Sequence, residues 1–415
     1  MDMSIALLWD ESFLWALTAH KGLRALGVEP CIVSAADVRG GALEGHGVLF
    51  VPGGWASDKS AKLGPEGADA VRSFVRSGGS YLGICGGAGL ALDDRGGLAL
   101  THVSRVPTAH RVPSFSGEII LKPTDAAHPI WRGIRRPYSF TAWWPGQFHI
   151  PADSGVRVLA EYDRPGRGFC TADLNASDVE LYDDGYEKWE AGYGINLDPA
   201  RLAGEPAIIE AEYGTGRVLL SYLHLETPGS RKGNRALANL LEYLKPQRQV
   251  CNKRGKASAR KTCPVSPEAA RASEEMYRAA REFISFGERN MLWYWRTPWL
   301  LQWRRGVRGV EYSMLYAMLG EIRGITDGRV NDMVVALEGD VLSFFEDAKR
   351  LLMKERRALM GGSMSTIKST DPEVDRLREG LFSGSKRLGG RYKDILDRLD
   401  AVIYSSYNKG GADWV

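Results

Sequence analysis

The run SYLGICGGAG, residues 80–89, determines how the first part of this chain folds. Ser80 to Ile84 is a short apolar stretch typical of a buried strand, and it leads directly into Cys85, which has glycines nearby on both sides. Glycines permit the sharp, strained turn by which a strand passes into a helix and exposes one side chain at the edge of a parallel sheet. The run therefore predicts a nucleophile elbow with Cys85 as its thiol.

A second run, GRVLLSYLHLE at residues 216–226, places a histidine and a carboxylate at the end of another apolar strand. In an extended segment, residues two apart share a face, so His224 and Glu226 can both point toward the elbow. Nucleophilic catalysis by a thiol needs a base beside it and an acid that orients the base. We therefore predict a catalytic triad of Cys85, His224 and Glu226.

Further residues are expected to complete this site. The oxyanion formed during acyl transfer is expected to be bound by backbone N–H groups of glycines, which allow close approach of the substrate. These glycines are Gly53, Gly54 and Gly86. The side chains expected to line the pocket, with ordinary packing as the alternative, are Trp55, Trp144 and Gln147.

An elbow cysteine followed much later by Gly-Arg-Val and His-x-Glu resembles the class I glutamine amidotransferase-like superfamily. Within it, residues 3–244 are most similar to the N-terminal domain of biotin-protein ligases and its free-standing bacterial relatives. The supporting runs are VLFVPGGW (48–55), GGSYLGICGGA (78–88) and HPI (128–130). The resemblance implies a flavodoxin-like parallel sheet with helices on both faces and ligands at the carboxyl ends of its strands.

The chain departs from the amidotransferase pattern in two places. Leu225 stands where the family has a proline between histidine and glutamate, and Gly89 stands where a polar residue normally helps to hold glutamine. Glutamine is therefore not the expected substrate. The arginine-rich motif of biotin ligases and the glycine-rich phosphate-binding motifs are absent from the sequence, so we expect no biotin ligase activity and no cofactor.

The length of 415 residues favours two domains. Strands alternate with helices along residues 1–244, which predicts an α/β domain with a parallel sheet. Residues 245–267 are basic and are expected to form a linker. Residues 268–415 show almost purely helical patterns, including 299–323 and one helix running from 371 to about 402, and predict an all-α bundle of four or five helices.

Composition excludes several classes of function. The formal net charge of +3 gives no strong nucleic-acid signal, and the seven histidines have no standard ligand spacing, so no metal is expected. Five irregularly spaced cysteines do not predict disulfides. Because the sequence shows neither a signal peptide nor a transmembrane stretch, we expect a cytoplasmic location. His20 is expected on the solvated face of a surface helix.

The leading hypothesis is a cysteine-dependent amidase or amidotransferase-like hydrolase that acts on a small carboxamide or amide, with the helical domain recruiting a protein partner or capping the site. A different hypothesis is a catalytically silent ligand-binding or scaffold protein that keeps the pocket. A third is a relative of the intracellular cysteine peptidases that share this fold. The sequence does not determine the oligomeric state.

Overall fold

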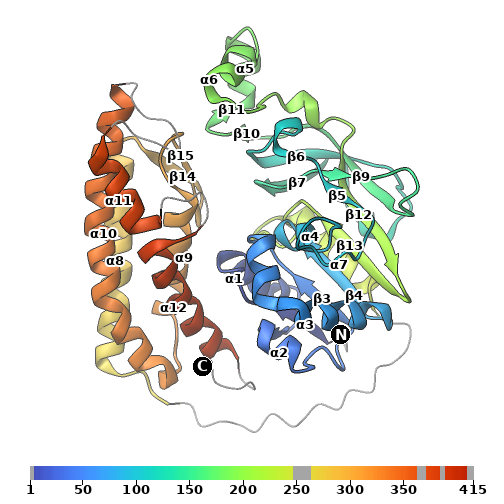
Figure 1. Cartoon of the computed structure of the whole chain (residues 1–415), viewed down its shortest axis with the longest axis horizontal. Coiled ribbons are helices and arrows are strands. Elements are labelled where there is room, and N and C mark those ends of the chain that lie inside the picture. Colours follow the sequence, from blue (N-terminus) through green and yellow to red (C-terminus); the bar gives the residue numbers. More distant parts are fainter. Residues whose placement is uncertain (1–3, 246–262, 362–370, 384–387, 409–415) are drawn as a thin grey trace. The chain divides into compact units, whose positions relative to one another are not determined.

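The computed structural model of the chain describes residues 4–245, 263–361, 371–383 and 388–408. The chain divides into two compact units, Met1–Lys253 and Arg254–Val415, coloured blue to yellow-green and pale yellow to red in Figure 1. Most of the basic segment 245–267, which we predict to be a linker, lies outside the described residues.

The first unit is built from short strands and helices. Its strands are β1 (Ile5–Leu8), β2 (Cys31–Val33), β3 (Val48–Val51), β4 (Ser80–Ile84), β5 (Ser104–Arg105), β6 (Phe115–Pro123), β7 (Tyr138–Trp143), β8 (Phe148–His149), β9 (Arg157–Pro165), β10 (Cys170–Thr171), β11 (Leu174–Asn175), β12 (Pro206–Tyr213) and β13 (Gly216–Ser221). Its helices are α1 (Leu14–Ala25), α2 (Ala35–Arg39), α3 (Ala56–Arg76), α4 (Gly86–Leu90), α5 (Ala176–Tyr182), α6 (Glu187–Tyr193) and α7 (Arg231–Tyr243), with short 3-10 turns η1 (Thr108–His110), η2 (Pro129–Trp131) and η3 (Pro199–Leu202).

In the described part of this unit, eleven strands form one mixed sheet in the order β11-β10-β6-β9-β12-β13-β4-β3-β1-β2, with β7 paired to β6. The strands from β13 to β2 run parallel, whereas those from β12 to β11, with β7, pair antiparallel. The central strands β1, β3 and β4 are buried along their whole length, as expected of parallel strands covered on both faces. The predicted α/β class is thereby confirmed.

The position of α1 corrects one expectation. His20 is only 5% exposed, and its ring meets that of Trp9 edge-on at 6.5 Å between centroids. Nine of the twelve residues of this helix are buried, so it is not solvated along one face as expected. No helix in the described ranges is long and apolar enough to span a membrane.

The second unit is helical with one hairpin. Its elements are α8 (Pro267–Arg289), β14 (Trp293–Thr297), β15 (Leu300–Trp303), α9 (Val310–Arg323), η4 (Gly328–Val330), α10 (Asn331–Met360), α11 (Pro372–Phe382) and α12 (Gly390–Tyr407). The helical prediction is confirmed for most of the unit. It is wrong at the β14–β15 hairpin, where Pro298 prevents a helix and aromatic residues favour strands. The single helix predicted from 371 to about 402 is also wrong, because α11 ends at Phe382 and α12 begins at Gly390.

Candidate active site

The segments predicted to form the site follow three neighbouring strands of the sheet. Strand β4 lies between β3 and β13, and all three run parallel. Their carboxyl ends therefore lie at one edge of the sheet. Gly53 and Gly54 follow β3, Cys85 follows β4, and His224 follows β13, so the topology brings these segments together.

Cys85 occupies the sharp turn between β4 and α4. Its φ of 51° and ψ of −105° are unusual for a residue with a side chain and are typical of strained functional positions. Its backbone N–H donates a hydrogen bond of 2.8 Å to the carbonyl of Ser221 at the end of β13. The half-buried thiol donates to the carbonyl oxygen of Trp143 at 3.7 Å.

The glycines of the elbow allow backbone to touch backbone. A Cβ added at Gly86 would lie 1.8 Å from the carbonyl oxygen of Gly54, and one added at Gly87 would lie 1.9 Å from that of Val51. Both distances are far below van der Waals contact, so larger residues cannot be accommodated without displacing β3 or the loop that follows it. Gly86 is the first residue of α4, where a backbone N–H has no acceptor within the helix.

His224 and Glu226 form a buried pair just beyond β13. Nδ1 of His224 lies 2.7 Å from Oε1 of Glu226, and both side chains are only 1% exposed. The backbone N–H of His224 donates to the carbonyl of Thr141 at 2.8 Å, which fixes the segment against β7. Within the described residues, Nε2 of His224 has no hydrogen-bond partner, so this nitrogen remains available to a reacting group.

The electrostatic environment favours the charged imidazolium. Burial lowers the pKa of His224, but the carboxylate of Glu226 and the neighbouring Cys85 raise it by more, to about 10. Cys85 is therefore a close neighbour of the imidazole, and its thiol also donates to the carbonyl of Trp143. At neutral pH the imidazole of His224 is therefore protonated and carries a positive charge.

This raised pKa makes stability depend on pH. A histidine whose pKa is about 10 when folded and 6.5 when unfolded contributes its stabilisation fully below pH 6.5 and loses it as pH rises to 10. We expect Glu226→Gln to lower the free energy of unfolding of the first unit at pH 6. At pH 10 the loss should be smaller by at least about 1.4 kcal/mol, the energy that corresponds to one pKa unit. Urea unfolding scored by pulse proteolysis at pH 6, 8 and 10 measures this. The exposed control Glu44→Gln should give no such trend. If Glu226→Gln lowered the free energy of unfolding equally at all three pH values, the raised pKa of His224 would be contradicted.

Trp15 in α1 packs against the imidazole, which the sequence did not predict. Its ring lies 4.5 Å from that of His224 at an interplanar angle of 36°. A Cβ at Gly53 would lie 2.8 Å from Cγ of Trp15 and 3.1 Å from Cε1 of His224. The imidazole is therefore held by an indole on one side and by the Gly53 backbone next to it. Gly53 has a packing role here, whether or not its N–H binds an oxyanion.

The structure places the three predicted pocket residues in different surroundings. Trp55 is 47% exposed directly before α3. Trp144 is half-buried with a φ of 47° and lies in the loop after β7, beside the carbonyl that accepts the thiol hydrogen bond. Gln147 is buried, and its Oε1 accepts a hydrogen bond of 2.9 Å from the N–H of Val112. Gln147 therefore anchors a loop, while its role in a pocket stays a prediction.

Two buried tyrosines near the thiol were also missed. Burial raises the pKa of both Tyr162 and Tyr222, and Cys85 is among the groups that raise them further. Within the described residues, neither hydroxyl has a hydrogen-bond partner. Tyr222 lies two residues before His224, so the i, i+2 pattern that led to Glu226 could have indicated it.

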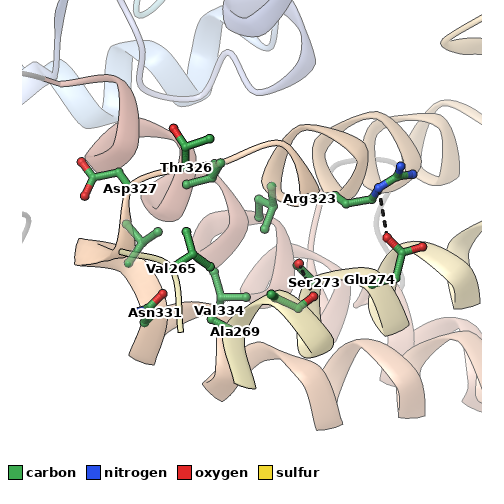
Figure 2. A pocket seen from close by; sticks show the side chains of 13 residues that line it. Val265, Ala269, Ser273, Glu274, Arg323, Thr326, Asp327, Asn331 and Val334 are labelled. Carbon is green, nitrogen blue, oxygen red and sulfur yellow. Dashed lines mark hydrogen bonds and ion pairs between the residues drawn. The ribbon is translucent and has the colours of Figure 1, made fainter. Parts of the chain in front are cut away.

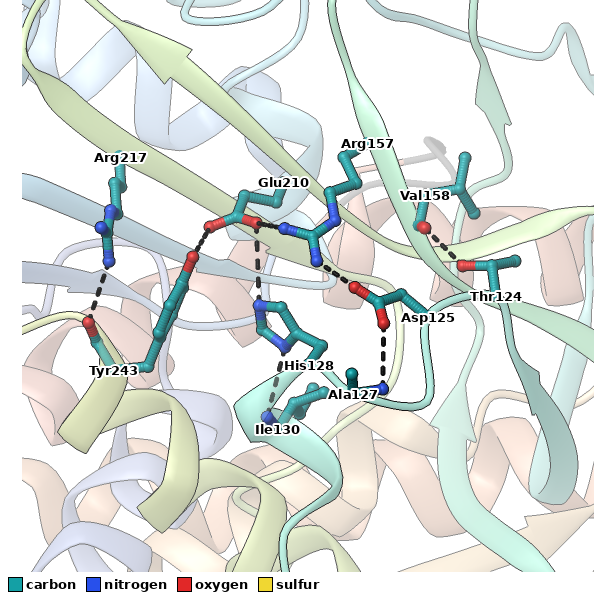
Figure 3. A network of polar contacts seen from close by, with 10 residues as sticks. All are labelled: Thr124, Asp125, Ala127, His128, Ile130, Arg157, Val158, Glu210, Arg217 and Tyr243. Atoms are coloured by element: carbon teal, nitrogen blue, oxygen red, sulfur yellow. Dashed lines mark hydrogen bonds and ion pairs between the residues drawn. The ribbon is translucent and has the colours of Figure 1, made fainter.

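His128, part of the HPI run, belongs to a structural network (Figure 3). Its Nε2 lies 3.7 Å from the carboxylate of Glu210, which also accepts hydrogen bonds from Tyr243 at 2.7 Å and Arg157 at 3.4 Å. Arg157 in turn pairs with Asp125. The network ties η2 to β12, β9 and α7. Among the described residues, no group of three or more His, Cys, Asp or Glu side chains is placed to hold a metal ion.

The second unit contains a pocket of about 530 Å³ between α8, α9, η4 and α10 (Figure 2). Its lining is part apolar, with Ala269 and Val334, and part charged. The charged groups are already paired, because Arg323 lies 3.0 Å from Glu274 and Asp327 lies 2.6 Å from Arg329. We assign no ligand to this pocket.

No protein-family model matches the chain, and no curated protein matches it in sequence. Among solved structures, the chain is similar to a candidate GMP synthase subunit from Thermoplasma acidophilum, with 16% identity and a TM-score of 0.37, over 59% of this chain and 95% of that one. It is also similar to a candidate ThuA-like protein from Bacteroides uniformis, with 13% identity and a TM-score of 0.38, over 59% and 93%. These are similarities of fold alone, and the narrower resemblance to biotin-ligase N-terminal domains stays a prediction.

Proposed function

We propose that the first unit is a cysteine-dependent amidase or amidotransferase-like hydrolase acting on a small carboxamide or amide. The observation that carries the proposal is the buried contact of 2.7 Å between His224 and Glu226, next to a strained elbow that presents Cys85. In this proposal, the nucleophile, the proton carrier and the group that orients the carrier lie at the same edge of the sheet. The narrower membership in the biotin-ligase N-terminal family, without ligase activity, is part of this proposal.

The mechanism is acyl transfer in two steps. The Cys85 thiolate attacks the carbonyl carbon of the amide, and backbone N–H groups of Gly54 and Gly86 bind the oxyanion. His224, which carries the proton on Nε2, gives it to the leaving nitrogen, so that the amine departs and a thioester remains on Cys85. A water molecule then attacks the thioester, His224 takes one proton from that water, and the acid product leaves as the Cys85 thiolate is restored beside the protonated His224. Glu226 keeps the imidazole oriented and stabilises its charge.

The helical unit would recruit a protein partner or cap the site, and the division into domains at 1–244 and 268–415 would let each fold on its own. The cytoplasm, with its reduced thiols, suits an enzyme whose nucleophile is a cysteine.

Ammonia release tests the proposal. The full-length protein is incubated with a panel of small primary carboxamides, and ammonia is measured against Cys85→Ala protein. Release by wild type that the variant lacks supports the hydrolase. The panel is then extended to secondary amides, whose products are identified by mass. If no compound of either kind is hydrolysed in a Cys85-dependent way, the hydrolase proposal is wrong.

A second candidate function is ligand binding without turnover. The observation that favours it is the hydrogen bond that the thiol donates to the carbonyl of Trp143, which holds the proton on the sulfur. A binding protein would keep the pocket while Cys85 stays unreactive, and the pH dependence of Cys85 alkylation separates the two.

A further inference from the structure

We propose that the molecule bound at Cys85 carries a carboxylate, and that Arg111 holds this group together with the hydroxyl of Tyr222 and the nearby Arg105. The inference rests on the proposed function in taking Cys85 as the centre of the site, and it adds the class of substrate: amides with a carboxylate elsewhere in the molecule.

A short loop after β7 borders all the groups concerned. The carbonyl of Trp143 accepts the thiol hydrogen bond at 3.7 Å, and the carbonyl of Pro145 accepts a hydrogen bond of 3.3 Å from Nη1 of Arg111. The hydroxyl of Tyr222 lies 2.6 Å from the position of a Cβ on Gly146. Residues 143 to 146 span at most about 10 Å even when fully extended. The thiol, a guanidinium and a phenol therefore lie along one short loop, and both Cys85 and Arg111 act electrostatically on the Tyr222 hydroxyl.

Arg111 brings a charge that no described carboxylate compensates. The side chain is partly buried, its Nε atom has no hydrogen-bond acceptor within the described residues, and it makes no ion pair with any described carboxylate. Burial lowers the pKa of Arg111, and the guanidinium of Arg105 lowers it further. A desolvated guanidinium whose Nε lacks an acceptor and whose charge is unpaired is unfavourable, and a bound carboxylate would supply both the missing acceptor and the missing charge.

Tyr222 supplies a neutral donor at the same place. Its side chain is 1% exposed, and its ring is fixed against Phe148 at 4.1 Å between centroids. Burial raises the pKa of its hydroxyl, so the phenol keeps its proton at neutral pH. A buried hydroxyl without a partner is costly in a folded protein, and a carboxylate oxygen is a suitable acceptor.

Arg105 contributes to the net charge of the site, which determines the ligand charge that fits it. A Cβ at Gly89 would lie 2.7 Å from Nη2 of Arg105, and the N–H of Gly89 donates to the carbonyl of Cys85 at 3.0 Å. Arg105 therefore lies against the elbow helix. It is also 3.9 Å from Asp94, so two guanidinium groups and one carboxylate leave a net charge of +1. This charge matches a carboxylate monoanion better than a phosphate dianion.

A pair of alkylating reagents tests the inference. Iodoacetate and iodoacetamide have the same reactive carbon, and in both the Cys85 sulfur displaces iodide, but only iodoacetate carries a carboxylate. The rate ratio of iodoacetate to iodoacetamide at Cys85, measured by peptide mass spectrometry, should exceed the ratio for N-acetylcysteine in the same tube by about tenfold, the scale of a charge-assisted hydrogen bond. Arg111→Met should bring the ratio down to that of N-acetylcysteine, and the exposed Arg135→Met should leave it unchanged. Equal ratios in wild type and Arg111→Met would overturn the inference.

A binding measurement separates this inference from the proposed function. If Cys85 reacts with neither reagent, the hydrolase fails, and the carboxylate site is then decided by calorimetry on Cys85→Ala protein. Glutaramate, which has one carboxylate and one carboxamide, should bind at least about tenfold more tightly than neutral glutaramide. Arg111→Met should remove this preference. No preference for glutaramate would refute the carboxylate site even if wild type hydrolyses amides.

Discussion

Gly86→Ala is expected to abolish the native elbow. The added methyl group would lie 1.8 Å from the carbonyl oxygen of Gly54, and that oxygen belongs to backbone that a side-chain rotation cannot move aside. Either the loop after β3 or the start of α4 must shift, and both are parts of the proposed site. We expect a loss of several kcal/mol of stability, on the order of the largest single-residue effects in proteins.

A matched control is available in the same unit. Gly192 lies in α6, is exposed, and has no atom within 4 Å of an added Cβ. Gly192→Ala should therefore stabilise the unit by about 0.5–1 kcal/mol, because alanine is the better helix former. Urea unfolding of both variants measures the contrast. A stability of Gly86→Ala close to that of wild type would show that the close approach at the elbow is not present.

The second large effect is expected from His224→Ala in the ammonia assay. The substitution removes the group that gives a proton to the leaving nitrogen, and general acid–base catalysis typically contributes about 10²–10⁴-fold. We expect kcat to fall by this factor, with a smaller change in KM, because His224 acts on the reacting atoms. The exposed His102→Ala serves as the control and should keep full activity. A change in KM alone, with kcat preserved, would contradict the role of His224 as a proton carrier.

The sequence was most informative where the signal is local. Apolar runs that end in Cys85 and His224 predicted strands β4 and β13, and parallel order then brings their ends together. The glycine-rich elbow was visible for the same reason, because a strained turn selects its residues over a few positions.

Residues brought in by long-range packing were not predictable in this way. Trp15 reaches His224 from α1, and Arg111 and Tyr162 come from the segments before and after β6 and β7, in the part of the unit where the sheet is antiparallel. Nothing in their neighbouring sequence indicates this placement. The β14–β15 hairpin was missed for another reason, since a short aromatic run fits a strand or a buried helix equally well by periodicity.

The most direct measurement is the pH dependence of Cys85 alkylation by iodoacetamide in wild type and in His224→Ala. The exposed Cys263 serves as an internal reference in the same protein. The proposed site predicts that Cys85 reacts faster than Cys263 between pH 5 and 7, where an ordinary thiol with a pKa of about 8.5 is protonated, and that His224→Ala slows Cys85 alone. If Cys85 reacts no faster than Cys263, or is indifferent to His224, the nucleophile is not activated and the catalytic proposal is wrong.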